Sequence, residues 1–189
     1  MNTYLRIHTV KFLLLKLLST PFGKKQPMKF RRLTNDELQE LEKEFVQFLV
    51  SNTITAEDWE KIKKENPERA EGLIGIFSDI VFEKVIGNIQ YLEHRTPKNL
   101  RAYYCVSDRI YMLGILVEGK SDLDLSKDDS PADMMQKLQT SEAALKVFSG
   151  EKKYKKEKAL EIFELMQEGA LISHDGNMFK LLSQLVQQK

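Results

Sequence analysis

The stretch LRAYYCVSDRIYMLGILV, residues 100–117, decides the fold class of this chain. It contains two runs rich in aromatic and β-branched side chains, LRAYYCV and RIYMLGILV, which are joined at the polar segment SDR. Two such runs connected by a short polar turn are typical of an antiparallel β-hairpin. We therefore expect a hairpin over about 100–117, and a third strand over about 145–149 that pairs with it.

Two helix starts precede the hairpin. Thr34 is followed three residues later by Glu37, and Thr55 is followed in the same way by Asp58. In such a pair, each side chain accepts a hydrogen bond from the backbone N–H group of the other residue, which is the capping box that begins a helix. The sequence therefore predicts one helix after Thr34 and another after Thr55.

A long central helix is predicted between these helices and the hairpin. From Glu68, apolar residues at helical spacing form a wide stripe that continues through QYLEH, residues 90–94. Thr96–Pro97 stops the pattern, because the residue before a proline disfavours the helical conformation. Further helices are expected after Ser130, over 155–169 and over 177–188. The predicted fold class is α+β, with a helical N-terminal half, a small antiparallel sheet and helices after it.

Charge divides the chain near residue 28. Residues 1–27 carry five basic residues and no acidic one, and removing these five charges from the net charge of +1 leaves −4 for the remainder. The apolar run Val10–Leu18 is too short to span a membrane, and the segment from Met28 has the character of a protein start. We interpret residues 1–27 as an N-terminal extension outside the fold, and residues 28–189 as a single α+β domain.

The segment GILVEGKS matches the pattern of a phosphate-binding loop, G-x-x-x-x-G-K-[ST]. Its candidate cofactor-binding residues are Gly114, Gly119, Lys120 and Ser121. A working loop lies between a strand and a helix whose N-terminus faces the phosphates. Here the next helix start is at Ser130, so the context favours a strand end over a nucleotide site.

Two neighbouring titratable residues, Glu93 and His94, are candidates for acid–base catalysis. The alternative is that His94 complements the negative end of the predicted long helix. Cys105 is the single cysteine, and it suits a reducing compartment and excludes an internal disulfide. Neither the histidines nor Cys105 have metal-ligand spacing, so we expect no metal site and no cofactor.

Basic residues in two segments are candidates for contacts with nucleic acid. They are Arg31 and Arg32 in KFRR, and Lys152, Lys153, Lys155 and Lys156 in KKYKKEK. Such residues bind phosphates electrostatically. The alternative is a solvated surface, which the net negative charge of the remainder of the chain favours.

Four segments together resemble a family of small bacterial proteins of unknown function: MKFRRLT, SNTITAEDWEKIK, FSDIVFEKV and QYLEH. The resemblance covers Met28 to Lys189. It implies a cytoplasmic bacterial protein, and because no activity is assigned to that family, no functional residue carries over.

The sequence therefore favours a non-catalytic α+β protein that binds another protein or acts as an adaptor. The first alternative is association with RNA or the ribosome through the basic residues. The second is a nucleotide-binding protein at Lys120, or an enzyme that uses Glu93 and His94. The oligomeric state is left open.

Overall fold

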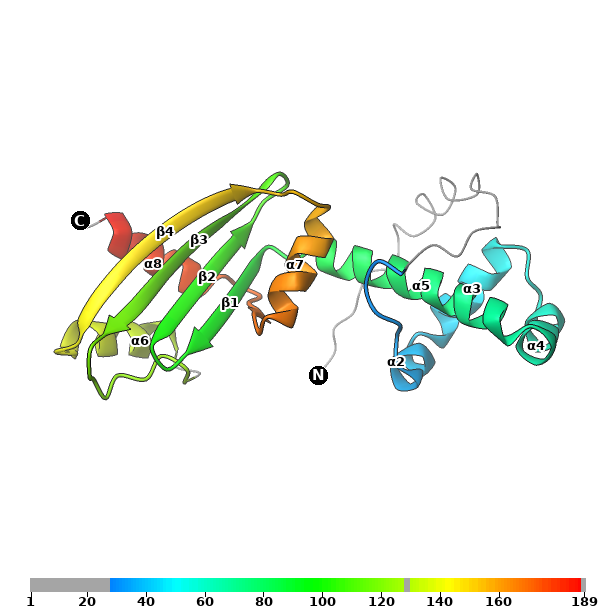
Figure 1. Ribbon diagram of the computed structural model, residues 1–189, viewed down its shortest axis with the longest axis horizontal. Coiled ribbons are helices and arrows are strands. Elements are labelled where there is room, and N and C mark those ends of the chain that lie inside the picture. Colours follow the sequence, from blue (N-terminus) through cyan, green and yellow to red (C-terminus); the bar gives the residue numbers. More distant parts are fainter. Residues whose placement is uncertain (1–27, 128–129, 188–189) are drawn as a thin grey trace. The chain divides into compact units, whose positions relative to one another are not determined.

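The computed structural model describes residues 28–127 and 130–187 of the 189-residue chain (Figure 1). The contacts within the chain divide it into two compact units, the first ending at Val81 and the second beginning at Phe82. The N-terminal extension expected over residues 1–27 lies outside the described residues. The single domain expected over 28–189 stays a prediction.

The first unit is helical. It contains α2 (Asn35–Glu40), α3 (Glu42–Ser51), α4 (Ala56–Glu65) and the first part of α5 (Pro67–Gly87). Both predicted capping boxes are confirmed, because Thr34 and Thr55 each exchange hydrogen bonds with the residue three positions later. The one helix expected after Thr34 is interrupted at Leu41, whose backbone angles (φ −102°, ψ 21°) separate α2 from α3.

Aromatic rings form the centre of this unit. The ring centroid of Phe45 lies 5.3 Å from that of Trp59 and 5.1 Å from that of Phe77, in edge-to-face arrangements. Phe48 lies 5.5 Å from Phe77. Since Phe45, Phe48 and Phe77 are all buried, this aromatic cluster joins α3, α4 and α5.

The segment from Met28 is tied to α5 by polar contacts. The Asp79 carboxylate accepts hydrogen bonds from the backbone N–H groups of Lys29 (2.9 Å) and Phe30 (3.0 Å). The buried Ser78 hydroxyl accepts one from the N–H of Leu33 (3.0 Å). The chain is therefore fixed to α5 before α2 begins.

The predicted end of the long helix is wrong. α5 ends at Gly87, and most of QYLEH lies in a strand, β1 (Tyr91–Thr96). A short run with one strongly apolar residue, Leu92, fits helical and strand periodicity alike. The pairing partner decides between them: all six residues of β1 are in register with the next strand, and Leu92 is fully buried there.

The second unit contains a five-stranded antiparallel sheet, and this confirms the α+β class (Figure 1). The predicted hairpin is β2 (Asn99–Cys105) and β3 (Arg109–Glu118). The predicted third strand is β4 (Ala144–Lys153), which is longer than expected and pairs with β3 over its whole length. A two-residue strand, β5 (Leu171–Ile172), was not predicted. The order across the sheet is β4-β3-β2-β1-β5.

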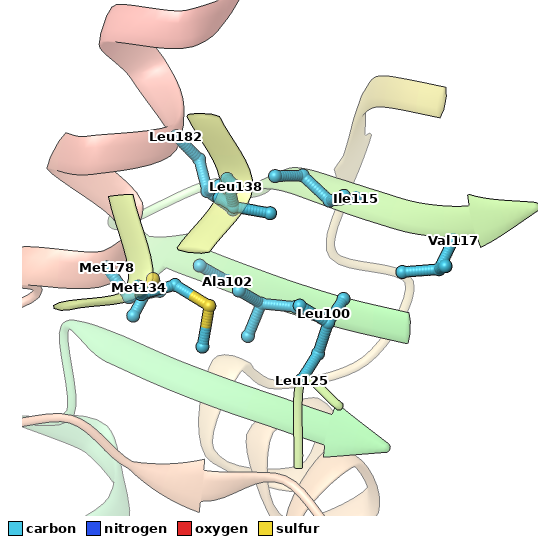
Figure 2. Packing of buried hydrophobic residues seen from close by; sticks show 9 residues of the cluster. All are labelled: Leu100, Ala102, Ile115, Val117, Leu125, Met134, Leu138, Met178 and Leu182. Atoms are coloured by element: carbon cyan, nitrogen blue, oxygen red, sulfur yellow. The ribbon is translucent and has the colours of Figure 1, made fainter. Parts of the chain in front are cut away.

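Two helices cover one face of the sheet, α6 (Pro131–Thr140) and α8 (Asn177–Gln187). Figure 2 shows the buried cluster between them and the strands, to which β2, β3, both helices and a loop residue contribute. Its members are Leu100, Ala102, Ile115, Val117, Leu125, Met134, Leu138, Met178 and Leu182. Because side chains alternate along a strand, every second residue of β2 and β3 faces this layer. A further helix, α7 (Lys158–Gln167), follows β4.

A glycine in β3 makes room for an aromatic ring on the opposite face of the sheet. Gly114 is directly across from Phe148 of β4, and a Cβ atom added to Gly114 would lie 2.3 Å from Cζ of that ring. The ring therefore lies over the glycine, a pairing that restores the packing a strand glycine lacks. No described helix is long and apolar enough to cross a lipid bilayer.

We predict that Gly114→Ala lowers the free energy of unfolding by about 1–3 kcal/mol, because the Phe148 ring must move. Denaturant unfolding measures this change. Gly150→Ala is the matched control, since its Cβ would meet only the terminal methyl of Met112 at 3.5 Å, an ordinary contact. Adding Phe148→Ala should remove most of the Gly114→Ala penalty. Equal stability of the Gly114→Ala and wild-type proteins would contradict the packing described.

Candidate functional site

The residues that match the phosphate-loop pattern do not form such a loop. Gly114 lies within β3, whose neighbours on both sides are antiparallel strands. Gly119 adopts a positive φ of 73° in a turn after the strand. Ser121 accepts a hydrogen bond from the N–H of Leu123 (3.1 Å), and the next helix begins only at Pro131. The backbone N–H groups are thus engaged in strand pairing rather than arranged around an anion.

The structure does not bring Glu93 and His94 together. They are neighbours in β1, so their side chains lie on opposite faces of the sheet. Glu93 is held by Arg95 (Oε2 to Nη2, 2.7 Å) and by the hydroxyl of Ser173 (2.7 Å), which links β1 to the chain after β5. His94 lies beside Gly169, whose added Cβ would be 3.3 Å from the His94 Nε2 atom. We infer a structural role for Glu93.

Four of the six candidate nucleic-acid residues are in ion pairs. In the first unit, Arg31 pairs with Glu37 (2.7 Å) and Arg32 with Glu71 (2.8 Å). In the second, Lys152 pairs with Glu161 (2.7 Å) and Lys156 with Glu164. Lys153 and Lys155 are exposed, and neither forms an ion pair with a residue in the described part of the chain. These contacts neutralise much of the positive charge that the sequence suggested.

Glu161 organises the lysine-rich segment. Glu161 lies on α7, and its side chain is buried, at 5% exposure. Its carboxylate accepts hydrogen bonds from the backbone N–H groups of Lys155 and Lys156, and it also forms the ion pair with Lys152. Burial acts to raise the pKa of Glu161, but these hydrogen bonds outweigh it and hold the pKa below the usual value of a glutamate. The segment is therefore a structured connection between β4 and α7.

Sequence reasoning missed a half-open groove lined with aromatic rings on the second unit. We call it the aromatic groove; its volume is about 430 Å³. It is lined by Tyr104, Tyr111, Met112, Leu113, Ser149, Gly150, Glu151 and Phe179. The residues come from β2, β3, β4 and α8, so the groove exists only in the folded sheet.

Two stacked tyrosines, Tyr104 and Tyr111, line the aromatic groove, and Tyr91 continues the stack beyond it. The rings of Tyr91 and Tyr104 are 4.9 Å apart with an interplanar angle of 17°, and those of Tyr104 and Tyr111 are 6.3 Å apart at 23°. Phe179 of α8 packs against Tyr104 at 5.6 Å. Each ring is only partly buried, so part of the aromatic surface of the stack is open to solvent.

Strand register explains why these rings meet. Tyr91 is directly opposite Tyr104, and Tyr104 is directly opposite Tyr111, so all three lie on one face at adjacent positions. Gly176 (φ 63°) allows α8 to begin against Tyr91, because an added Cβ would lie 2.5 Å from that ring. The signal was present in the hairpin, since Tyr104 and Tyr111 are equally distant from its turn.

A second cavity, of about 550 Å³, lies around the loop before α6 and the end of that helix. Its charged lining residues are three basic and three acidic: Lys120, Lys127, Lys137, Asp122, Asp124 and Glu142. Mixed charges of this kind select neither an anion nor a cation. In residues 28–127 and 130–187, no cluster of three or more His, Cys, Asp or Glu side chains could hold a metal ion.

Cys105 has the character of an unreactive core residue. It is 1% exposed, and burial raises the pKa of its thiol to about 11, despite the opposing effects of Lys158 and the hydrogen bond with Tyr154. A nucleophilic cysteine needs a thiolate near neutral pH. The aromatic groove is therefore the better candidate for a functional site.

We predict that Glu161→Gln lowers the free energy of unfolding by about 2 kcal/mol near neutral pH, because the charged hydrogen bonds that it accepts are weakened. The lowered pKa of Glu161 makes this contribution present above the unfolded value of 4.5 and lost as the pH falls through the folded value. The two proteins should thus converge in stability in acid. Denaturant unfolding across pH measures both effects.

The matched control is Glu164→Gln, which removes the exposed ion pair with Lys156. A surface pair of this kind contributes about 1 kcal/mol or less. If the two variants lose equal stability, or if the Glu161→Gln difference persists in acid, the assigned role of the buried carboxylate is wrong.

Comparison with known proteins agrees with the resemblance seen in the sequence. The sequence model of a family of unknown function (DUF6495) matches residues 28–187, a range that extends over parts of both compact units. No curated protein and no solved structure matches the chain. Since the family match covers well over half of the sequence, this chain belongs to the family of unknown function DUF6495.

Proposed function

We propose that this protein is a non-catalytic binding protein or adaptor, and that its partner is another protein that docks in the aromatic groove. The observation that carries the proposal is the mainly apolar groove lined by the stacked rings of Tyr104 and Tyr111 and by Phe179, which is open to solvent. A stacked array of this size at a surface is more than core packing requires.

The chemistry of the groove supports a protein ligand. Tyrosine and other aromatic residues are enriched among the residues that dominate protein–protein binding energy, because they bury large apolar area with few rotatable bonds. Ser149 and Glu151 at the rim supply polar groups around this apolar centre, which is the usual arrangement of an interface.

RNA is the second candidate ligand. Bases stack on tyrosine rings, and Lys153 and Lys155 remain available on the second unit to contact phosphates. The ion pairs made by Lys152 and Lys156 weaken this alternative. Catalysis and nucleotide binding have less support. The side chains of Glu93 and His94 lie on opposite faces of the sheet, and no helix begins directly after the 114–121 segment.

We infer that the protein acts in the bacterial cytoplasm. The support is the family resemblance, together with a single cysteine that is buried as a free thiol. A reduced cysteine and no disulfide framework suit a reducing compartment.

The proposal predicts site-specific crosslinking. The photoreactive amino acid p-benzoylphenylalanine, placed at Tyr111 of the full chain in cells of its source, should give one discrete adduct on irradiation. Mass spectrometry should identify a single protein in it. Adding Tyr104→Ala should reduce the adduct strongly, because truncation of a central aromatic costs about 2 kcal/mol of binding energy.

The matched control places the same amino acid at Leu171, which is 73% exposed on β5 at the other edge of the sheet. It should give no such adduct. An adduct that is equally abundant at both positions would count against the groove. An adduct whose mass falls on nuclease treatment would favour RNA instead.

A further inference from the structure

β4 forms an open edge of the sheet beside the aromatic groove. It is the outermost strand and its ten residues pair only with β3. Figure 1 shows it at the edge of the sheet, and no described strand pairs with its outer side. By contrast, the strand at the other edge, β5, has two residues. Exposed edges of this length are templates for an added strand.

The direction of the free backbone groups follows from the turn beyond β4. The N–H of Tyr154 donates to the carbonyl of Asp108 (3.2 Å), so Tyr154 is bonded to the β3 side. Since bonded residues alternate along an antiparallel strand, the even-numbered residues of β4 bond to β3. The outward N–H and C=O groups are therefore those of the odd-numbered residues, Leu145, Val147, Ser149, Glu151 and Lys153.

These outward residues also border the aromatic groove. Ser149 and Glu151 line it, and they are directly opposite Leu113 and Tyr111 of β3. A strand added along β4 would continue the pleat, so every second side chain of that strand would face the groove side of the sheet. Backbone hydrogen bonds at the edge and a side-chain pocket beside it are the two parts of recognition by strand addition.

The charged side chains of β4 indicate what kind of segment would bind at this edge. Glu151 is near Arg109 (3.7 Å) and Lys152 pairs with Glu161 (2.7 Å), whereas Lys146 and Lys153 are exposed and form no ion pair with any described residue. The edge is therefore net positive. A second copy of the chain would bring like charges to this edge, whereas acidic side chains would be attracted to it.

We propose that β4 takes up an extended acidic segment of a partner protein as a sixth strand, with a bulky apolar side chain of that segment in the aromatic groove. This inference rests on the proposed protein-binding function and specifies how the partner is recognised.

The test begins with short peptides selected from a random displayed library on the full-length protein. The selected peptides should be acidic and carry a bulky apolar residue. Binding of their consensus peptide should slow hydrogen exchange of the amides of Val147, Ser149 and Glu151. Ser149→Pro removes one outward N–H without removing a bond to β3, and proline is tolerated at such edge positions. It should weaken peptide binding by about tenfold or more, and Ser149→Ala, which removes the same hydroxyl but keeps the outward N–H, should weaken binding much less.

The possible results of this test distinguish strand addition, the acidic character of the segment and self-association. If Tyr111→Ala abolishes binding and Ser149→Pro leaves it unchanged, strand addition is wrong and the groove still binds protein. If no peptide is enriched, or the selected peptides are basic, the acidic occupant is wrong, and the crosslinking at Tyr111 still decides the proposed function. A wild-type dimer that Ser149→Pro converts to a monomer would make the occupant a second copy. The hydrogen-exchange measurement uses the wild-type protein, so strand addition can still be tested if the Ser149→Pro variant does not fold.

Discussion

The pairing of β2 with β3 is the constraint on which the second unit depends. Its register places Leu100 opposite Ile115 and Tyr104 opposite Tyr111. The first pair belongs to the core beneath α6 and α8, and the second belongs to the aromatic groove. Because side chains alternate with a period of two, a slip of one residue would expose the core residues and separate the tyrosines. Core and groove are therefore consequences of one hydrogen-bonded ladder.

The sequence predicted correctly those elements that depend on interactions between residues close together in the chain. The boxes at Thr34 and Thr55 are satisfied within three residues, and the hairpin needs only two strands and a short turn. β1 could not be recognised in this way, because its residues become a strand only through pairing with β2. β5 has two residues, and its existence depends on a partner far away in the chain.

The candidate site depended even more on distant contacts. The sequence showed a row of lysines but not that Glu161 and Glu164, several residues later, return to pair with Lys152 and Lys156. It also showed the residue spacing of a phosphate-binding loop, but the first residues of that segment, from Gly114 to Glu118, belong to strand β3. Tyr91, Tyr104, Tyr111 and Phe179 come from four elements, and only the sheet register and the start of α8 bring them together. The symmetric placement of Tyr104 and Tyr111 about the turn was the one part of the groove that the sequence could have given.

The register of β2 and β3 can be measured directly by nuclear Overhauser contacts between backbone α-protons in solution. The hydrogen bond from Val106 to Arg109 (3.0 Å) makes Tyr103 and Met112 a non-hydrogen-bonded pair, in which the two α-protons are close. We expect strong contacts for Tyr103 with Met112 and for Cys105 with Ile110. Contacts displaced along one strand, or their absence in the folded protein, would contradict the arrangement from which both the core and the aromatic groove follow.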